Sequence, residues 1–291
     1  MNVIESSILT PGQKTLDSII ALNSVAGDKE NKGVSKEELE KNIISINIYN
    51  RLTNRFCVGS GFFLTADGFI ATAGHITDVL YTFVPKPYAP IEITQDFYFA
   101  FDSTGREYPL DTTFVYRDSG LDVALLKAIK PEPAKPIGYR FNENFPANQT
   151  LSLIAPSHIK PEGFDIEKID GKLIRKGLPL HWINEAGLDK IWVDAIGRPG
   201  QSGSPIINEY AEICATFCGV GPSLLPEASY SAPADSLVKL INSSVACLAE
   251  RYRKITGYDP LSGRHIPAHL HDKHRQEYLS MVKRCQDLKN K

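Results

Sequence analysis

The sequence predicts an all-β fold built from two groups of strands. Short apolar or β-branched runs, punctuated by Gly, Asp and Pro, recur through the middle of the 291-residue chain, as they do in all-β proteins. The runs lie on either side of the Pro-rich residues 130–138, which we interpret as a linker. Helical periodicity is found only toward the two ends of the chain. This grouping favours two β-barrels or a pair of sandwiches.

Composition and charge narrow the class of protein. Hydrophobic residues make up 42% of the chain and charged residues 23%, which is ordinary for a globular protein with a sizeable core. The 32 Lys and Arg residues against 34 Asp and Glu residues give a net charge of -2, so no basic excess indicates a nucleic-acid or membrane-surface partner. We therefore expect no nucleic acid and no membrane among the partners.

The N-terminus and the cysteines predict a cytoplasmic location. The first charged residue is Glu5, and no basic segment followed by an apolar block is found there, so we expect no export signal. Five cysteines, an odd number, do not indicate a disulfide framework. On a strand, Cys214 and Cys218 would lie about 13 Å apart, beyond the reach of a disulfide. Reduced thiols are typical of cytoplasmic proteins.

The N-terminal residues 1–41 are polar and helix-prone, and we expect them to form an extension. Within it Ser35 is a candidate helix N-cap with Glu38 three residues later, the pattern of a capping box. Residues 42–130 are predicted to form the first barrel. Its strands are expected at 43–50, 58–65, 68–75, 91–101 and 121–129.

Residues 131–249 are predicted to form the second barrel and a terminal helix. The strands are expected at 150–156, 164–174, 190–196, 204–210 and 212–221. After Asp235, a predicted N-cap, apolar residues recur at helical spacing up to Leu248, which indicates a helix with one apolar face. Residues 250–291 are predicted to be a C-terminal helical extension.

One stretch, GRPGQSGSPIIN at residues 197–208, points to chemistry. Because glycine permits backbone angles and close approaches that a side chain forbids, this turn can present the hydroxyl of Ser202 together with bare N–H groups. The alternative is a simple tight turn into a strand, since these residue types dominate turns. A serine nucleophile also needs a base and a carboxylate that orients the base. The candidates are His75 and Asp122, with Asp118 as a rival carboxylate.

Three segments together resemble the signatures of the trypsin-like serine proteases: GSGFFLTADGFIATAGH, SGLDVALLKA and VDAIGRPGQSGSPIIN. They occur between Ile43 and Leu248 in the order His, Asp, Ser of the chymotrypsin fold. The nucleophile segment is similar to that of the bacterial Deg or HtrA type, which also carries an Asp-Ala pair, here Asp194 and Ala195. The resemblance implies two six-stranded antiparallel β-barrels with helical extensions at both ends. No PDZ domain is recognisable in the tail.

The same resemblance implies the roles of the site residues. His75 would take the proton of Ser202 and pass it to the leaving amine, while Asp122 would orient the imidazole. The N–H groups of Gly200 and Ser202 would form the oxyanion hole. The implied activity is that of a serine endopeptidase, which hydrolyses peptide bonds of a protein or peptide substrate through an acyl-enzyme. No metal and no organic cofactor are implied.

The resemblance also implies a set of substrate-binding residues: Ile196, Gly197, Cys218, Gly219, Val220 and Gly221. The strand that holds the last four would pair with an extended substrate backbone. No acid stands at Ile196 or Gly197, where relatives that prefer Lys or Arg carry one. We therefore expect small or medium apolar residues before the scissile bond, because a buried cation would lose its hydration without gaining a partner.

Three residues depart from the family's pattern. Ser204 stands where a second Gly is usual, and Cys218 falls near a Ser or Thr that commonly supports the buried Asp. Gln201 replaces the acid that in digestive relatives receives a newly made N-terminal ammonium. We therefore expect the oxyanion hole to be ordered constitutively or by a switch in the loop of residues 197–201.

Other interpretations have less support. A histidine cluster suggests a metal site, but a proline interrupts any helix there and no Cys pair joins the cluster. Its members are His265, His269, His271 and His274. The two glycines of residues 219–224 lack the Lys of a phosphate loop. The alternative function is that of a catalytically silent protease-fold scaffold, and both extensions are candidate sites for a regulatory partner or for self-association.

Overall fold

The computed structural model describes most of the central part of the chain. The described residues are 13–27, 35–50, 55–80, 97–118, 120–129, 139–142, 146, 148–160, 163–176, 190–220, 228–265 and 276. Contacts divide the chain into two compact units, Asp28–Leu240 and the combination of Met1–Gly27 with Ile241–Lys291. The predicted linker lies outside the described residues, and the domain boundaries expected from the sequence stay predictions.

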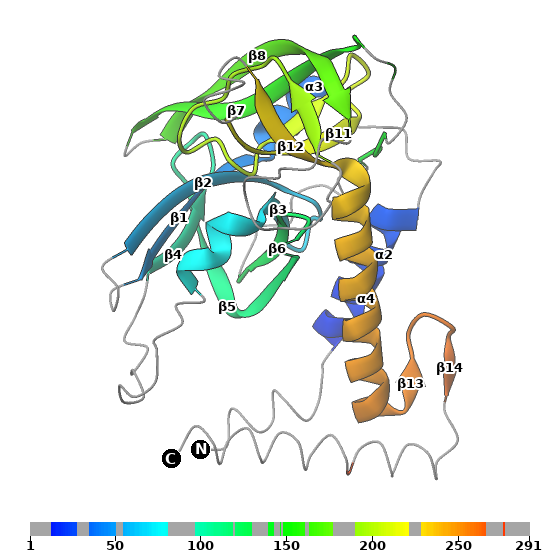
Figure 1. The fold of residues 1–291 in the computed structure, drawn as a ribbon. Coiled ribbons are helices and arrows are strands. Elements are labelled where there is room, and N and C mark those ends of the chain that lie inside the picture. The colour runs from blue at the N-terminus through cyan, green and yellow to red at the C-terminus, as the bar shows by residue number, and fades with distance from the viewer. Residues whose placement is uncertain are drawn as a thin grey trace, which may run out of the picture. The chain divides into compact units, whose positions relative to one another are not determined.

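The first of two closed barrels in the larger unit is drawn in blue to teal in Figure 1. Its strands are β1 (Ile43–Asn50), β2 (Arg55–Phe63), β3 (Phe69–Ala73), β4 (Phe97–Phe101), β5 (Glu107–Asp118) and β6 (Val123–Ala128). They are antiparallel in the order β1-β2-β3-β6-β5-β4, and β4 pairs with β1 to close the barrel. The β1 side chains of Ile44, Ile46 and Ile48 are fully buried, and so are those of Ile43 and Ser45.

The second closed barrel follows in green to gold (Figure 1). Its strands are β7 (Thr150–Lys160), β8 (Gly163–Lys176), β9 (Ile191–Val193), β10 (Pro205–Ile207), β11 (Ile213–Val220) and β12 (Ser229–Pro233). They are antiparallel in the order β10-β11-β12-β9-β8-β7, closed between β7 and β10. Leu153, Val193, Ile206 and Phe217 lie in its buried core. The double-barrel fold expected from the resemblance is confirmed.

The apolar runs predicted five strands in each barrel and did not reveal β5 or β12. In β5, Glu107 and Pro109 are exposed, so the apolar side chains do not form a continuous run. In β12, Ser229 and Ser231 are buried where an apolar residue would be expected. These two strands are therefore identified by their pairing rather than by hydrophobicity.

Three α-helices occur within the described residues: α2 (Gln13–Gly27), α3 (Lys36–Lys41) and α4 (Ala234–Thr256). The capping box at α3 is confirmed, because the Glu38 N–H donates to Ser35 Oγ at 3.2 Å and the Ser35 N–H to Glu38 Oε2 at 3.1 Å. Asp235, expected to be an N-cap, lies inside the first turn of α4. A carboxylate is favourable there as well, near the positive end of the helix dipole.

A short hairpin follows α4 and consists of β13 (Tyr258–Asp259) and β14 (Arg264–His265). The helical pattern expected beyond it, at residues 278–288, lies outside the described residues. Of the helices that the structure describes, none combines the length and the hydropathy needed to span a bilayer.

Candidate active site

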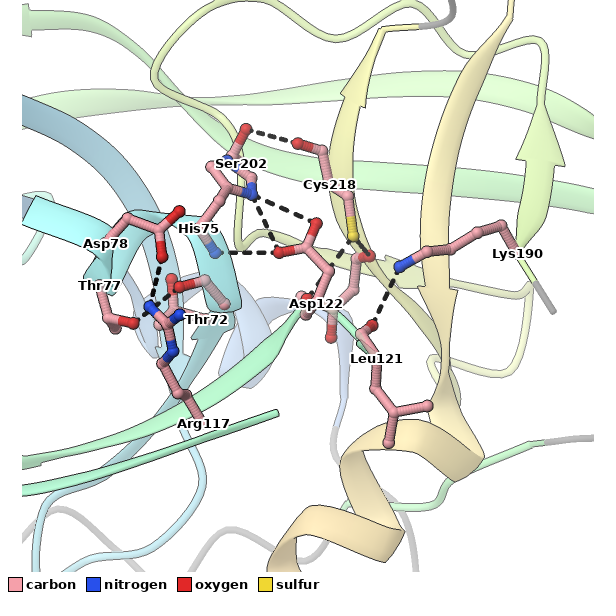
Figure 2. A network of polar contacts seen from close by, with 12 residues as sticks. Thr72, His75, Thr77, Asp78, Arg117, Leu121, Asp122, Lys190, Ser202 and Cys218 are labelled. Atoms are coloured by element: carbon pink, nitrogen blue, oxygen red, sulfur yellow. Dashed lines mark hydrogen bonds and ion pairs between the residues drawn. The ribbon is translucent and has the colours of Figure 1, made fainter. Parts of the chain in front are cut away.

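His75 and Asp122 are brought together by two paired strands of the first barrel. His75 lies at the start of the 3-10 helix η1 (Gly74–Leu80), directly after β3, and Asp122 directly precedes β6, which pairs with β3. The Nδ1 atom of His75 lies 3.1 Å from Oδ1 and 3.2 Å from Oδ2 of Asp122. The backbone N–H of His75 also donates to Oδ1 at 2.9 Å (Figure 2). Two contacts of the imidazole and one of the backbone N–H therefore fix His75 against the carboxylate.

The turn before β6 gives Asp122 an unusual backbone conformation. Its φ of 56° lies in the left-handed region, where Asp is one of the few non-glycine residues that are found regularly. Gly74 packs closely beside it, because a Cβ at that position would lie 3.1 Å from the backbone carbonyl carbon of Asp122, a tight contact. The rival carboxylate, Asp118, accepts the N–H of Leu121 at 2.9 Å. Asp118 thus stabilises the turn that holds Asp122.

The carboxyl group of Asp122 is ionised more readily than an ordinary aspartate. Burial raises its pKa, but the hydrogen bonds from His75 and the charges of His75 and Lys190 outweigh that effect and hold the pKa below the usual value. The side chain of Asp122 is 16% exposed and that of His75 is 39% exposed. The carboxylate is therefore largely shielded, whereas the imidazole is open to solvent.

Ser202 lies in the turn before β10, and its hydroxyl is bonded within the second barrel. It donates to the backbone carbonyl of Cys218, on β11, at 2.9 Å. The described hydrogen bonds include none between Ser202 and His75. Cys218 also places its Sγ atom 3.7 Å from the carbonyl oxygen of Asp122 (Figure 2). One residue of β11 therefore contacts both the serine and the aspartate.

The turn before Ser202 has the geometry that presents backbone N–H groups. The N–H of Gln201 donates to the carbonyl of Arg198 at 3.1 Å, with Pro199 and Gly200 between them. Gly200 has a φ of 91°, as the third residue of a type II turn requires. Within the described part of the chain, no hydrogen bond uses the N–H of Gly200 or of Ser202. Both donors are left for a ligand oxygen.

Ser60, on β2 of the first barrel, ties this turn to the other half of the site. Its N–H donates to the carbonyl of Ser202 at 2.7 Å, and its hydroxyl donates to the carbonyl of Gly200 at 2.6 Å. Gly203, with a φ of 99°, has no room for a Cβ because Ser60 and Thr72 occupy that space. Ser60 is not among the site residues predicted from the sequence. The signal it offered is a polar residue between two glycines in an otherwise apolar strand.

Gln201 is almost completely buried, at 2% exposure, and its amide group is fully engaged. Its Oε1 accepts the N–H of Arg198 at 2.8 Å. Its Nε2 donates to the carbonyl of Pro156, on β7, at 3.1 Å and approaches Oε2 of Glu167, on β8, at 3.3 Å. The other carboxylate oxygen of Glu167 pairs with Arg198 at 3.2 Å. Gln201 therefore anchors the turn to the second barrel.

The residues expected to bind substrate lie on two segments of the second barrel. Ile196 and Val220 are exposed, at 46% and 40%. Gly197 is buried with the ring of Phe217 where a Cβ would be, and Gly219 is backed by Tyr230. Cys218 is buried on β11. Gly221 lies outside the described residues.

Within the described part of the chain, no group of three or more His, Cys, Asp or Glu residues is arranged so that it could hold a metal ion. Of the histidine cluster, His265 is exposed on β14, and the other three members lie outside the described residues.

The comparisons with known proteins agree with this architecture. The family model of the trypsin-like peptidase domain matches residues 59–215, a span that contains His75, Asp122 and Ser202. Comparison with curated protein sequences gives no match.

Several solved structures share the fold. The Rv3671c protease from M. tuberculosis, in its active form, is 14% identical with a TM-score of 0.53, over 71% of this chain and 82% of that chain. The HtrA-type protease AlgW, with a tripeptide, is 15% identical with a TM-score of 0.54, over 72% of this chain and 62% of that chain. Deg5 is 16% identical with a TM-score of 0.56, over 72% of this chain and 92% of that chain.

The two kinds of comparison carry different weight. At these identities the solved structures establish the fold, whereas the family model covers more than half of the sequence, from β2 to β11. The chain therefore belongs to the trypsin-like peptidase family and is a serine protease.

Proposed function

We propose that the protein hydrolyses peptide bonds with Ser202 as nucleophile, His75 as general base and Asp122 as the group that orients His75. The observation that carries this proposal is the bonded pair of His75 and Asp122 beside a glycine turn that bears Ser202. Contacts of Ser60 and Cys218 hold the serine and the pair in one site.

The first step requires a rotation of the Ser202 side chain about its Cα–Cβ bond. The hydroxyl leaves the Cys218 carbonyl and turns toward Nε2 of His75, the ring nitrogen that does not face Asp122. Oγ then attacks the substrate carbonyl carbon while its proton passes to Nε2. Asp122, which is ionised, stabilises the imidazolium that forms.

The remaining steps complete the hydrolysis. The carbonyl oxygen of the substrate becomes an oxyanion and accepts hydrogen bonds from the N–H groups of Gly200 and Ser202. The C–N bond breaks as His75 gives its proton to the leaving amine, which leaves an ester on Ser202. Water then attacks the ester with His75 again as base, releases the new carboxyl group and restores the serine.

We expect the end of β11 that extends beyond its pairing with β10 to bind the substrate backbone. Once the Ser202 hydroxyl has turned away, the carbonyl of Cys218 is an acceptor for a substrate N–H. The exposed residue Val220 would continue the pairing, as in the addition of a strand to a sheet.

The pocket segments favour small or medium apolar side chains before the scissile bond. The described members Ile196, Gly197, Gly219 and Val220 carry no charge, and the rings of Phe217 and Tyr230 back the two glycines. A Lys or Arg side chain would lose its hydration there without finding a carboxylate.

A fluorophosphonate probe tests the nucleophile. The full-length chain should be labelled stoichiometrically, Ser202→Ala should not be labelled, and His75→Ala should react several orders of magnitude more slowly. Ser204→Ala is a matched control, because the Ser204 hydroxyl is buried without a hydrogen-bond partner among the described residues. Labelling of Ser202→Ala at the same rate would assign the nucleophile elsewhere.

Cleavage of a peptide library tests the pocket. Peptides with Ala, Val or Leu before the scissile bond should be cut in preference to those with Lys or Arg. Ile196→Asp should raise cleavage after Lys and Arg, since it adds a carboxylate to an exposed pocket position. Efficient cleavage by the wild-type chain after Lys or Arg, with none after Ala, Val or Leu, would contradict the assigned preference.

A further inference from the structure

Lys190 is a buried cation whose partner lies in the other barrel. It directly precedes β9 of the second barrel and is only 5% exposed. Its Nζ donates to the carbonyl oxygen of Leu121, in the first barrel, at 3.0 Å (Figure 2). Burying an ammonium group is costly unless it is paired. The usual role of surface lysines, which is to keep a protein soluble, therefore does not account for Lys190.

The partner of Lys190 is the turn that places Asp122. The backbone of Leu121 is held on both sides, since its N–H donates to Asp118 and its carbonyl accepts from Lys190. Asp122 follows with its left-handed φ of 56°, a conformation that persists only where the surroundings fix it. Among the described residues of the second barrel, Lys190 and Cys218 form part of those surroundings, Lys190 through the carbonyl of Leu121 and Cys218 through that of Asp122.

The charge of Lys190 also acts on the site. It is one of the causes that lower the pKa of Asp122, after the hydrogen bond and the charge of His75. It also opposes the rise in the pKa of Cys218, which burial and the charge of Asp122 bring about. The ammonium group therefore lies within electrostatic range of the carboxylate that faces His75.

We propose that Lys190 is a positioning residue of the active site, which fixes the Leu121–Asp122 turn and offsets part of the negative charge that Asp122 presents to His75. This inference rests on the proposed function, because it assigns His75 and Asp122 to the catalytic machinery. Lys190 acts through Asp122 and has no contact with the substrate.

The other charged and titratable groups near His75 come from several elements. They are Asp122 before β6, Cys218 on β11, and Asp78 on η1, which pairs with Arg117 of β5. Asp78 is paired with Arg117, and the carboxylate of Asp122, which faces the imidazole, is the group on which the charge of Lys190 acts. Loss of Lys190 leaves the carboxylate uncompensated, so the imidazolium that forms during catalysis is stabilised more strongly by Asp122.

Three variants separate the charge of Lys190 from its hydrogen bond. Lys190→Arg keeps both, Lys190→Gln keeps a donor without the charge, and Lys190→Met removes both while keeping an unbranched side chain. Lys160→Met is the matched control, because it removes one positive charge from an exposed position on β7.

The measurements are kcat, KM and the pH dependence of kcat/KM on one peptide substrate. Lys190→Met should lower kcat about tenfold, the size expected for one lost buried hydrogen bond, with KM little changed. In Lys190→Gln and Lys190→Met the acid limb of the profile should move up by about half a pH unit. Lys190→Arg and Lys160→Met should keep the wild-type acid limb.

A purely structural role predicts a different result. In that case Lys190→Gln and Lys190→Met would lower the melting temperature but leave both the acid limb and kcat per active site at wild-type values, which would overturn the proposal. If Lys190→Met does not fold, Lys190→Gln decides the outcome by the same criteria.

A second readout keeps this proposal distinct from the proposed function. The Nδ1–H proton of His75, followed by NMR as a function of pH, reports the contact with Asp122 whether or not peptides are cleaved. If the wild-type chain neither reacts with the probe nor cuts peptides, the proposed function fails. If this resonance and its pH dependence are the same in the wild type and in Lys190→Gln, the assignment of Lys190 fails, even in an active enzyme.

Discussion

The two barrels are alike in strand number and closure, but they contribute to the site in different ways. The first barrel presents His75 and Asp122 already joined by three contacts. The second barrel presents Ser202 with its hydroxyl bonded to the carbonyl of Cys218, on a neighbouring strand of the same barrel. In the proposed mechanism, the acid–base half is therefore assembled by side chains in advance. The proposed nucleophilic half is assembled by a backbone turn and would still require one side-chain rotation.

The largest effect is expected from a substitution that disrupts the contact between His75 and Asp122. Asp122→Asn should lower kcat/KM roughly 10,000-fold, because the amide no longer accepts from Nδ1 and leaves the imidazole in the wrong tautomer. Asn also tolerates the left-handed backbone of this position, so the fold should be retained. Circular dichroism checks the fold and steady-state kinetics the activity. Near-wild-type activity of the variant would remove Asp122 from the proposed triad.

A smaller effect is expected from a substitution in the turn that carries Ser202. Gln201→Leu removes the three hydrogen bonds of the side chain and should lower kcat about 10- to 100-fold by loosening the N–H groups of Gly200 and Ser202. Glu167→Gln should have a weaker effect, since it leaves the bond to Pro156 intact. Glu209→Gln, which changes an exposed acid in the turn after β10, is the control.

The Gln201 contacts also sharpen the expectation about activation. A neutral amide already anchored to Pro156 does not need a new N-terminal ammonium, so the chain with Met1 intact should react with the probe. Labelling is compared before and after limited trimming near Asn42. An inert full-length chain that becomes active only on trimming, and only with a free terminal amine, would instead indicate a zymogen.

The smallest expected effect concerns stability in acid. Folding lowers the pKa of Asp122, so the ionised carboxylate stabilises the folded state at pH values above its ordinary pKa of 3.8. This stabilisation is lost as the pH falls through the lower pKa of the folded state. The difference in unfolding free energy between wild type and Asp122→Asn should therefore shrink below about pH 4. Asp170→Asn, in the second barrel, should show a weaker pH dependence. Its pKa is also lowered, by Lys168 and Ser152, but its side chain is 54% exposed and solvent screens the interaction.

The sequence predicted those parts of the molecule that depend on local patterns. β1 coincides with its apolar run, and the positions of His75 and Asp122 at strand ends followed from the punctuation of the runs. The buried serines of β12 carry no apolar signal, so that strand was identified only by its pairing.

The supporting contacts of the site could not be predicted, because they join distant segments. Ser60 and Gly200 are 140 residues apart, and Lys190 and Leu121 are 69 residues apart. The sequence marks Ser60 only by its flanking glycines, and it marks Lys190 only as a lysine before an apolar run. Their roles depend on contacts between the two barrels, which no local sequence pattern indicates.

The bonds of Ser60 have a consequence for how the enzyme loses activity when it is heated. One residue of the first barrel, Ser60 of β2, holds the carbonyl groups of Gly200 and Ser202, while the core cluster of the second barrel is formed by residues of that barrel. A small displacement between the barrels would therefore misalign the oxyanion donors while every strand keeps its own pairing. Catalysis should fail several degrees before secondary structure is lost, and it should return on cooling, because the barrels themselves have not unfolded.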